Sequence, residues 1–443
     1  NKVYRYLLTF IDTVCHNSSM TKNARQTALD VLNDIFGNDA YANISLDRNL
    51  RDSELSTVDK AFVTALVYGV VSKKDLLEWH ITPFLKKEPK PWAKMLLLLT
   101  VYQILFMDKV PTSAAVDEAV KIAKRRDGQA TANFINAVLR NFMRSEHRNE
   151  EPKDWETKYS MPKLLLDKMV RQFGGKRTGE ILESLEKPSH VSLRRIDPTV
   201  EISGTRASLL TESALIADSG NFAMTEEFQS GRITIQDETS QLVAPQLDLE
   251  GTEEVLDACA APGGKSTHMA QYLTSGHITA LDLYDHKLDL INQNAERQHV
   301  ADKITTQKAD ATMIFEEFGS DKFDRILVDA PCSGIGLIRR KPDIRYRKES
   351  SDFVDLQKIQ LEILNSASKS LKKSGIMVYS TCTIFDEENF DVVRQFLESH
   401  PNFEQVEISS DKADMIKEGC IFITPEMYHT DGFFIAKFKK IGE

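Results

Sequence analysis

Two cysteines stand in short polar runs, and each run follows an apolar stretch typical of a buried strand. Cys332 closes the Asp-Ala-Pro-Cys run of residues 329–332, and Cys382 closes the Ser-Thr-Cys run of residues 380–382. A lone cysteine is most often a small buried hydrophobe. Two at corresponding strand ends, one of them close to Asp329, indicate chemistry instead, because a thiolate is a strong nucleophile once its pKa is lowered.

A third run, residues 257–267, has the composition of a ligand-binding turn between a strand and a helix. Gly264, Lys265 and Ser266 match the second half of a phosphate-binding loop. Cys259, however, stands where that loop needs its first glycine. The run also departs from the Gly-x-Gly-x-x-Gly pattern of dinucleotide sites. It therefore predicts a nucleoside-like cofactor that carries few or no phosphates.

Acidic residues end the next two predicted strands. Asp282, which follows Cys259 by 23 residues, is placed to accept hydrogen bonds from the ribose hydroxyls of an adenosine-containing ligand. Asp310 could accept a hydrogen bond from an adenine amine. The alternative for both is that aspartate commonly ends strands because it forms turns.

A thiol, a carboxylate and an adenosine cofactor together indicate methylation of a pyrimidine at C5. That carbon is unreactive until a nucleophile adds to C6, and an acid near N3, such as Asp329, assists the addition. The predicted methyl donor is S-adenosylmethionine, which has no phosphates. Lys265 would serve the cofactor loop or the target base, unless it is a helix-surface lysine. The residues alone leave open whether Cys332 or Cys382 attacks.

The elements that position these residues are predicted by hydrophobic periodicity. From residue 254, strands and helices alternate, which indicates an α/β fold with a doubly wound, Rossmann-like sheet that binds ligands at the carboxyl ends of its strands. We expect strands at 254–259, 277–283, 304–310, 323–329, 375–381, 403–408 and 433–439, and helices at 265–273, 286–298, 352–372 and 386–399. The expected domains are an extension at 1–19, an all-α bundle at 20–147, a small α+β module at 148–230 and a catalytic domain at 231–443.

Bulk composition excludes several classes of protein. Hydrophobic residues make up 41% of the chain and charged residues 28%, and no apolar run reaches the roughly 20 residues of a membrane span. Five cysteines without a Cys-x-x-Cys pair predict neither disulfides nor a metal site, and favour the cytoplasm. No secretory signal is recognisable, and we expect Met20 to be the natural start.

Charge is distributed unevenly along the chain. The net charge is −10, but residues 20–147 carry 18 basic and 15 acidic residues, against 36 and 50 in residues 148–443. Six of the ten residues at 339–348 are basic. This run starts seven residues after Cys332 and predicts contacts with a nucleic-acid backbone. The alternative is a solvated surface run. The residues expected to bind RNA are Arg339, Arg340, Lys341 and Arg345.

Taken together, the runs at 257–265, 329–333 and 380–382 resemble the RNA m5C methyltransferases of the Sun, NOL and NSUN type. The resemblance implies that Cys382 is the nucleophile and that Cys332 assists release of the methylated product. It also implies S-adenosylmethionine as the cofactor, held by Cys259, Ala260, Ala261, Pro262, Gly263, Gly264, Lys265, Asp282, Asp310 and Asp329.

The helical part indicates which RNA to expect as the substrate, because Pro111–Arg140 looks like a NusB-type RNA-binding domain. That domain fused to this catalytic part is similar to the branch of the family that methylates cytosine C5 in 16S ribosomal RNA. We therefore expect 16S rRNA as the partner of a monomeric enzyme. One alternative is a tRNA cytosine-C5 methyltransferase, against which the NusB-like domain argues. Another is a non-catalytic RNA-binding or antitermination factor, against which both cysteines and the cofactor loop argue.

Overall fold

A computed structural model describes residues 23–51, 53–408, 410 and 412–442; the extension predicted at 1–19 lies outside them. The chain forms two compact units. The helical unit contains the described residues up to Val170 together with Arg340–Arg347. The sheet unit contains Arg171–Arg339 and the described residues from Lys348 onward. The membership of Arg340–Arg347 in the helical unit is not apparent in the sequence.

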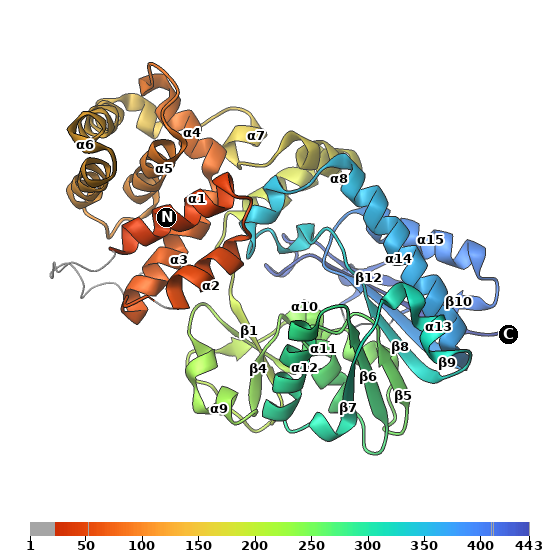
Figure 1. The fold of residues 1–443 in the computed structure, drawn as a ribbon. Helices are drawn as coiled ribbons and strands as arrows, with labels where there is room; N and C mark the ends of the chain where they lie inside the picture. The colour runs from red at the N-terminus through yellow and green to blue at the C-terminus, as the bar shows by residue number, and fades with distance from the viewer. Residues whose placement is uncertain (1–22, 52, 409, 411, 443) are drawn as a thin grey trace. The chain divides into compact units, whose positions relative to one another are not determined.

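The helical unit is a bundle around one apolar core (Figure 1). Its third helix begins after Ser56, whose hydroxyl accepts a hydrogen bond from Asp59 N at 3.1 Å, as an N-cap should. The sequence predicts separate helices near 114–124 and 131–143, and the structure has one run there that is interrupted at Gly128, where φ is 84°. The helices are α1 (Ala24–Gly37), α2 (Ala42–Arg51), α3 (Thr57–Ser72), α4 (Lys74–Ile81), α5 (Pro91–Phe106), α6 (Thr112–Arg144) and α7 (Trp155–Lys158). Helix α8 (Lys163–Leu185) follows, broken at Gly174.

The sheet unit begins with a small module that has its own apolar core. Four antiparallel strands make its sheet in the order β2-β3-β1-β4. This agrees with the mixed α+β pattern of the sequence. The strands are β1 (Val191–Arg195), β2 (Arg206–Ala207), β3 (Ala214–Ala217) and β4 (Ile233–Ile235). Helix α9 (Glu226–Gln229) lies between β3 and β4, and α10 (Glu238–Gln241) follows β4.

A nine-stranded sheet forms the centre of the sheet unit, in the order β11-β12-β13-β9-β8-β5-β6-β7, with β10 paired to β13. The strands β5 to β9 are parallel, as the predicted Rossmann-like fold requires. The strands from β10 onward add an antiparallel edge. The bounds are β5 (Glu254–Asp257), β6 (His277–Asp282), β7 (Ile304–Lys308), β8 (Phe323–Asp329), β9 (Leu371–Thr381), β10 (Phe403–Gln405), β11 (Ile416–Lys417), β12 (Cys420–Ile423) and β13 (Phe433–Lys440).

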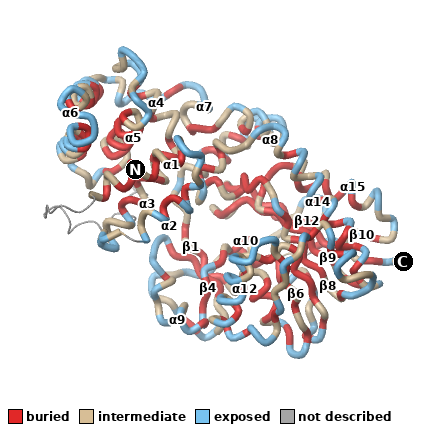
Figure 2. Tube along the Cα trace, viewed as in Figure 1, coloured by how far each residue is buried: buried red, intermediate tan, exposed pale blue. Residues whose placement is uncertain are grey.

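Helices pack against the sheet, and its central strands are buried (Figure 2). In chain order, two helices that contact each other precede β7. Three further helices, each in contact with the next, lie between β7 and β10. Within the described part of the chain, no helix is both long and apolar enough to cross a membrane. The helices are α11 (Gly264–Ala270), α12 (Asp285–Arg297), α13 (Ile314–Phe318), α14 (Ser350–Ser370) and α15 (Phe390–Ser399).

Strand register brings the predicted site residues to one edge of the sheet. Asp257 pairs in register with Ala280 on one side and Leu327 on the other, and Asp329 pairs with Ser380. Because parallel strands present their carboxyl ends at the same edge, the residues that follow β5, β6, β8 and β9 meet there.

Candidate active site

The loop after β5 is tied to both neighbouring strands. Ala258 N donates to Leu327 O at 2.9 Å, and Ala260 N donates to Leu281 O at 2.8 Å. Gly263 then takes φ 99° immediately before α11. A Cβ atom here would lie 3.1 Å from Ile291 Cα, so both the backbone angle and the close packing require glycine.

Asp257 ends β5 with a fully buried carboxyl group. Its Oδ2 accepts a hydrogen bond from Ser266 Oγ at 2.6 Å, while its Oδ1 has no hydrogen-bond partner within the protein. Burial, with a further contribution from Asp329, raises the pKa of this carboxyl to about 7. A buried acceptor left without a donor is costly, so it marks a place where a polar ligand group would be stabilised.

Cys259 lies in the loop itself, next to buried acids. Burial, followed by the charges of Asp257 and Asp329, raises the pKa of this thiol. It therefore stays protonated and unreactive, which fits a structural place in the predicted cofactor loop and not a nucleophile.

Asp329 and Lys265 form an ion pair at the floor of the site. Lys265 Nζ lies 2.7 Å from Asp329 Oδ2, and Ser380 Oγ donates to Asp329 Oδ1 at 2.7 Å. Burial lowers the pKa of Lys265, but the charge and the hydrogen bond of Asp329, with smaller contributions from neighbouring groups, together raise it overall. Both carboxylate oxygens of Asp329 are thus held in place, and the lysine stays charged beside it.

The two cysteines meet as their motifs predict. Cys332 Sγ and Cys382 Sγ are 3.2 Å apart, and Cys382 N lies 3.4 Å from Cys332 Sγ. Both side chains are partly exposed, at the ends of the paired strands β8 and β9. The hydrogen bond with Cys382 and burial raise the pKa of the Cys332 thiol well above its usual value. Cys332 therefore keeps its proton while Cys382 is its hydrogen-bonded neighbour.

A buried carboxylate that the sequence analysis missed supports both cysteine loops. Glu388 accepts hydrogen bonds from Ser333 N at 2.7 Å and from Ser333 Oγ at 2.6 Å. Gln360 Nε2 donates to it at 3.2 Å. Ser333 Oγ also lies 2.8 Å from Thr383 Oγ1, so the residues that follow the two cysteines are joined. The acidic run 386–388 resembles an ordinary helix start, and no local signal shows that Glu388 points inward.

Replacing Glu388 by alanine should destabilise the fold and slow catalysis together. The change leaves Ser333 N buried without an acceptor and removes one of the two acceptors of Gln360 Nε2, the other being Pro331 O at 2.9 Å. We expect this to cost about 2 kcal/mol. Urea unfolding measures the loss of stability, and kcat measures the effect on the cysteine loops. Glu388→Gln, which keeps one acceptor oxygen, should lose less of both. An alanine variant with wild-type stability and kcat would contradict this role.

A second missed residue, Arg194, joins the small module to the helix after the cofactor loop. This fully buried guanidinium donates to Gln236 Oε1 at 2.6 Å, Thr267 Oγ1 at 3.1 Å and Gln298 Oε1 at 2.9 Å. Burial lowers its pKa to about 9. Arginine on a short strand looks like a surface residue in sequence, whereas here it fixes α11 against β1 and so helps to position the loop.

The two remaining strand-end acids differ in their surroundings. Asp282 is largely buried, with Oδ1 3.3 Å from Tyr284 N and 3.7 Å from Lys287 Nζ. Asp310 is exposed, and its Oδ1 accepts hydrogen bonds from Thr312 N at 2.9 Å and Thr312 Oγ1 at 2.7 Å. Asp310 therefore forms the turn that was the alternative explanation for an aspartate at a strand end. Its contact with a cofactor stays a prediction.

The structure corrects the RNA contact predicted for Arg339. Its guanidinium donates to Thr430 O at 2.8 Å, to Pro425 O at 2.8 Å and to Ser184 O at 3.0 Å. These bonds cross-link three segments of the sheet unit. A side chain engaged in this way does not present its charge to a phosphate.

Arg345 requires the same correction, within the helical unit. Its side chain is buried and donates to Tyr159 O at 2.9 Å, Ser160 O at 3.1 Å and Ser72 O at 3.1 Å. It holds Arg340–Arg347 in the helical unit. RNA contacts by Arg340 and Lys341 stay predictions.

Among the residues whose placement is described, no cluster of His, Cys, Asp or Glu is arranged to hold a metal ion.

Comparison with known proteins agrees with both parts of this architecture. Residues 244–439 match the family model "16S rRNA methyltransferase RsmB/F", and residues 22–144 match the NusB family. The chain is 38% identical to a probable ribosomal RNA small subunit methyltransferase B of Bacillus subtilis, over 95% of this chain and 99% of that one. It is 31% identical to a ribosomal RNA small subunit methyltransferase B of Klebsiella pneumoniae, over 87% and 91%.

A solved structure shows the same fold. The crystal structure of NSun6 from Pyrococcus horikoshii with SFG is similar with a TM-score of 0.57 and 20% identity, over 64% of this chain and 99% of that one. The chain therefore shares the fold of that structure over about two thirds of its length.

Proposed function

The chain belongs to the RsmB/F family of 16S rRNA methyltransferases, and on this premise we propose that it methylates C5 of a cytosine in small-subunit rRNA through a covalent adduct with Cys382. The observation that carries the proposal is the 3.2 Å approach of Cys332 Sγ and Cys382 Sγ, beside the ion pair of Lys265 and Asp329. A single nucleophile would not need a second thiol at this distance, whereas formation and release of an adduct use both.

S-adenosylmethionine fits the loop after β5 and would supply the methyl group there. The unpartnered Oδ1 of Asp257 and the glycine turn at Gly263 suit a ligand that comes close to the backbone. Asp282, at the end of β6, is placed for ribose hydroxyls. The residues that we propose to hold the cofactor are Cys259, Ala260, Ala261, Pro262, Gly263, Gly264, Lys265, Asp282, Asp310 and Asp329.

Cytosine C5 becomes nucleophilic only after a thiolate adds to C6, and we assign this addition to Cys382. Asp329 would hydrogen-bond the base near N3 and stabilise the adduct. Lys265 and Ser380 occupy its two oxygens on the protein side, which fixes the direction of the carboxylate. Lys265 would also keep the local charge near zero when the base approaches.

We retain the predicted domain roles as part of this proposal. Residues 20–147 would bind RNA as a NusB-like domain, and residues 148–230 would join them to the catalytic domain at 231–443. The predicted monomeric state is also kept as part of this proposal. An rRNA substrate also favours the cytoplasmic location predicted from the cysteine pattern.

The assay that tests the function uses the purified full chain, radiolabelled S-adenosylmethionine and unmethylated 16S rRNA. We expect label in 5-methylcytidine after digestion to nucleosides. Transcripts of tRNA and 23S rRNA serve as controls. Faster labelling of tRNA would favour the tRNA enzyme, and tight binding of 16S rRNA without any labelling would favour a non-catalytic factor. Label in a different nucleoside would disprove the proposed chemistry.

A further inference from the structure

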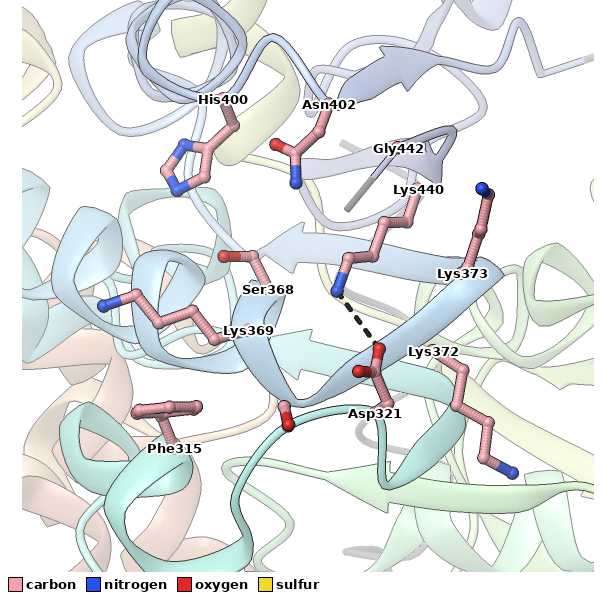
Figure 3. Close-up of a pocket in the computed structure, with 11 residues that line it drawn as sticks. Phe315, Asp321, Ser368, Lys369, Lys372, Lys373, His400, Asn402, Lys440 and Gly442 are labelled. Carbon is pink, nitrogen blue, oxygen red and sulfur yellow. Dashed lines mark ion pairs between the residues drawn. The ribbon is translucent and has the colours of Figure 1, made fainter.

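A hollow lined by lysines lies in the sheet unit, away from the candidate active site (Figure 3). It is formed where α14 ends and β9 begins, next to the end of β13. Strand β9 has Lys372 near its start, and Cys382 directly follows its end. Because β9 is irregular near Lys372, its length is best taken from β8, where Phe323 pairs with Leu371 and Asp329 pairs with Ser380. At about 3.3 Å per residue, the two ends are separated by roughly 20 Å. The lysines are Lys369, Lys372, Lys373 and Lys440.

The lysines of this hollow are not equivalent. Lys440 is buried, donates to Leu371 O at 2.7 Å and lies 3.6 Å from Asp321 Oδ1, so it has a structural role. Lys369 and Lys373 are exposed, and Lys372 is partly exposed with Nζ 2.9 Å from Asp324 Oδ1. Two exposed lysines and a third that is paired with Asp324 therefore line this space, in which Asp321 is already paired with Lys440.

The directions of these cations indicate the shape of the ligand. Figure 3 shows the ammonium groups of Lys369, Lys372 and Lys373 pointing away from one another around the rim. Groups that bind one phosphate ion would converge on one point. Groups spread around a rim instead suit a polyanion whose charges recur along a chain.

The charge of this hollow contrasts with the composition around it. Residues 148–443 carry 36 basic and 50 acidic residues, so three adjacent exposed or half-exposed lysines are not the average surface. The strongest basic run of the sequence, at 339–348, uses Arg339 and Arg345 for bonds to main-chain carbonyls. This leaves fewer cations of that run, such as Arg340 and Lys341, for phosphate contacts.

We propose that this lysine hollow binds the phosphate backbone of the substrate rRNA at a second place, remote from the target cytosine. The proposal rests on the proposed rRNA methyltransferase function. Only an RNA long enough to span the roughly 20 Å along the sheet can occupy both places. The hollow would thus favour folded rRNA over short fragments that contain the same cytosine.

The test removes three charges with the variant Lys369→Gln/Lys372→Gln/Lys373→Gln. Binding of 16S rRNA is measured over a range of salt concentrations. Each neutralised phosphate contributes about 0.9 to the slope of log K against log salt concentration, so we expect the slope to become shallower by roughly 2 to 3. We expect kcat/KM for long rRNA to fall by roughly tenfold or more. The value for a hairpin shorter than the span should stay unchanged.

Two matched variants separate a site from a general charge effect. The triple Lys→Arg variant at the same positions keeps the charges and should keep the wild-type slope. The variant Arg206→Gln/Arg232→Gln/Arg394→Gln removes three exposed arginines elsewhere in the sheet unit and should change the slope much less. An equal change in both triple Gln variants would overturn the proposal.

The remaining outcomes show whether the hollow binds a ligand other than RNA, or whether the protein has a function other than rRNA methylation. An unchanged rRNA slope, together with lost binding of polyglutamate, would show that the hollow binds an acidic protein instead and would disprove the RNA contact. If the wild-type chain labels no rRNA, the proposed function fails. If it labels rRNA normally and the lysine variant keeps both slope and kcat/KM, only the inference about the hollow fails.

Discussion

Replacing Cys382 by alanine should abolish methyl transfer, with kcat/KM falling by at least about a thousandfold, which corresponds to about 4 kcal/mol of transition-state stabilisation. Without the thiolate, C6 of the base has no nucleophile and C5 does not become reactive. The cofactor loop lies on a different strand, so affinity for S-adenosylmethionine should stay near the wild-type value. Single-turnover labelling of 16S rRNA and calorimetric titration of the cofactor measure the two quantities.

Cys420→Ala is the matched control for the loss of a thiol. Cys420 is buried in β12, next to Gln405 Nε2 at 3.3 Å, and it has no part in the proposed chemistry. Its alanine variant should retain activity once its fold has been checked by circular dichroism. A Cys382→Ala variant that labels rRNA at a near wild-type rate would show that another group attacks the base.

Sequence predicts the reactive residues because their signals are local. A polar run directly after an apolar strand, as at Cys332 and Cys382, can be recognised from a few neighbouring residues. The strand order of a Rossmann-like sheet then places the two runs next to each other. The same holds for the turn at Gly263, where small residues reflect close packing of the backbone. The helix break at Gly128 is also local, although helical residues continue directly on both sides of it.

Residues that act through distant partners are not predicted. Glu388 and Gln360 lie 28 positions apart, and their bond forms only because α14 and the segment before α15 meet in the fold. Arg194 reaches Gln298 across 104 positions. The high local charge density suggests a surface position for Arg345, but its carbonyl partners at Tyr159 and Ser72 lie in the helical part of the chain.

The contact between the two thiols suggests how proton transfer is ordered in the proposed reaction. Before the reaction, the hydrogen bond with Cys382 is the leading cause that raises the pKa of Cys332, so the proton stays on Cys332 and Cys382 is the one to react. Once Cys382 Sγ is bonded to C6, this cause is removed. The pKa of Cys332 then falls, although burial and the charge of Glu388 still raise it. In the proposed release step, Cys332 gives its proton to water and acts as the base.

The atoms and electrons of product release then balance without another reagent. The Cys332 thiolate takes the proton from C5, the electron pair of that C–H bond forms the C5=C6 double bond, and the C6–S bond breaks to return Cys382 as a thiolate. Cys332 ends as a thiol, as it began. One proton has passed to water for each methyl group transferred. The 3.2 Å between the sulfurs places the base beside the bond that must break.

Replacing Cys332 by alanine should therefore leave attack intact and block release. We expect a methylated covalent complex of protein and rRNA, visible as a retarded band on a denaturing gel, and a multiple-turnover rate lower by at least about a hundredfold, the usual contribution of a general base. The double variant Cys332→Ala/Cys382→Ala should form no such band, because the bond to C6 requires Cys382. Normal turnover of Cys332→Ala without a retarded band would assign release to a different base.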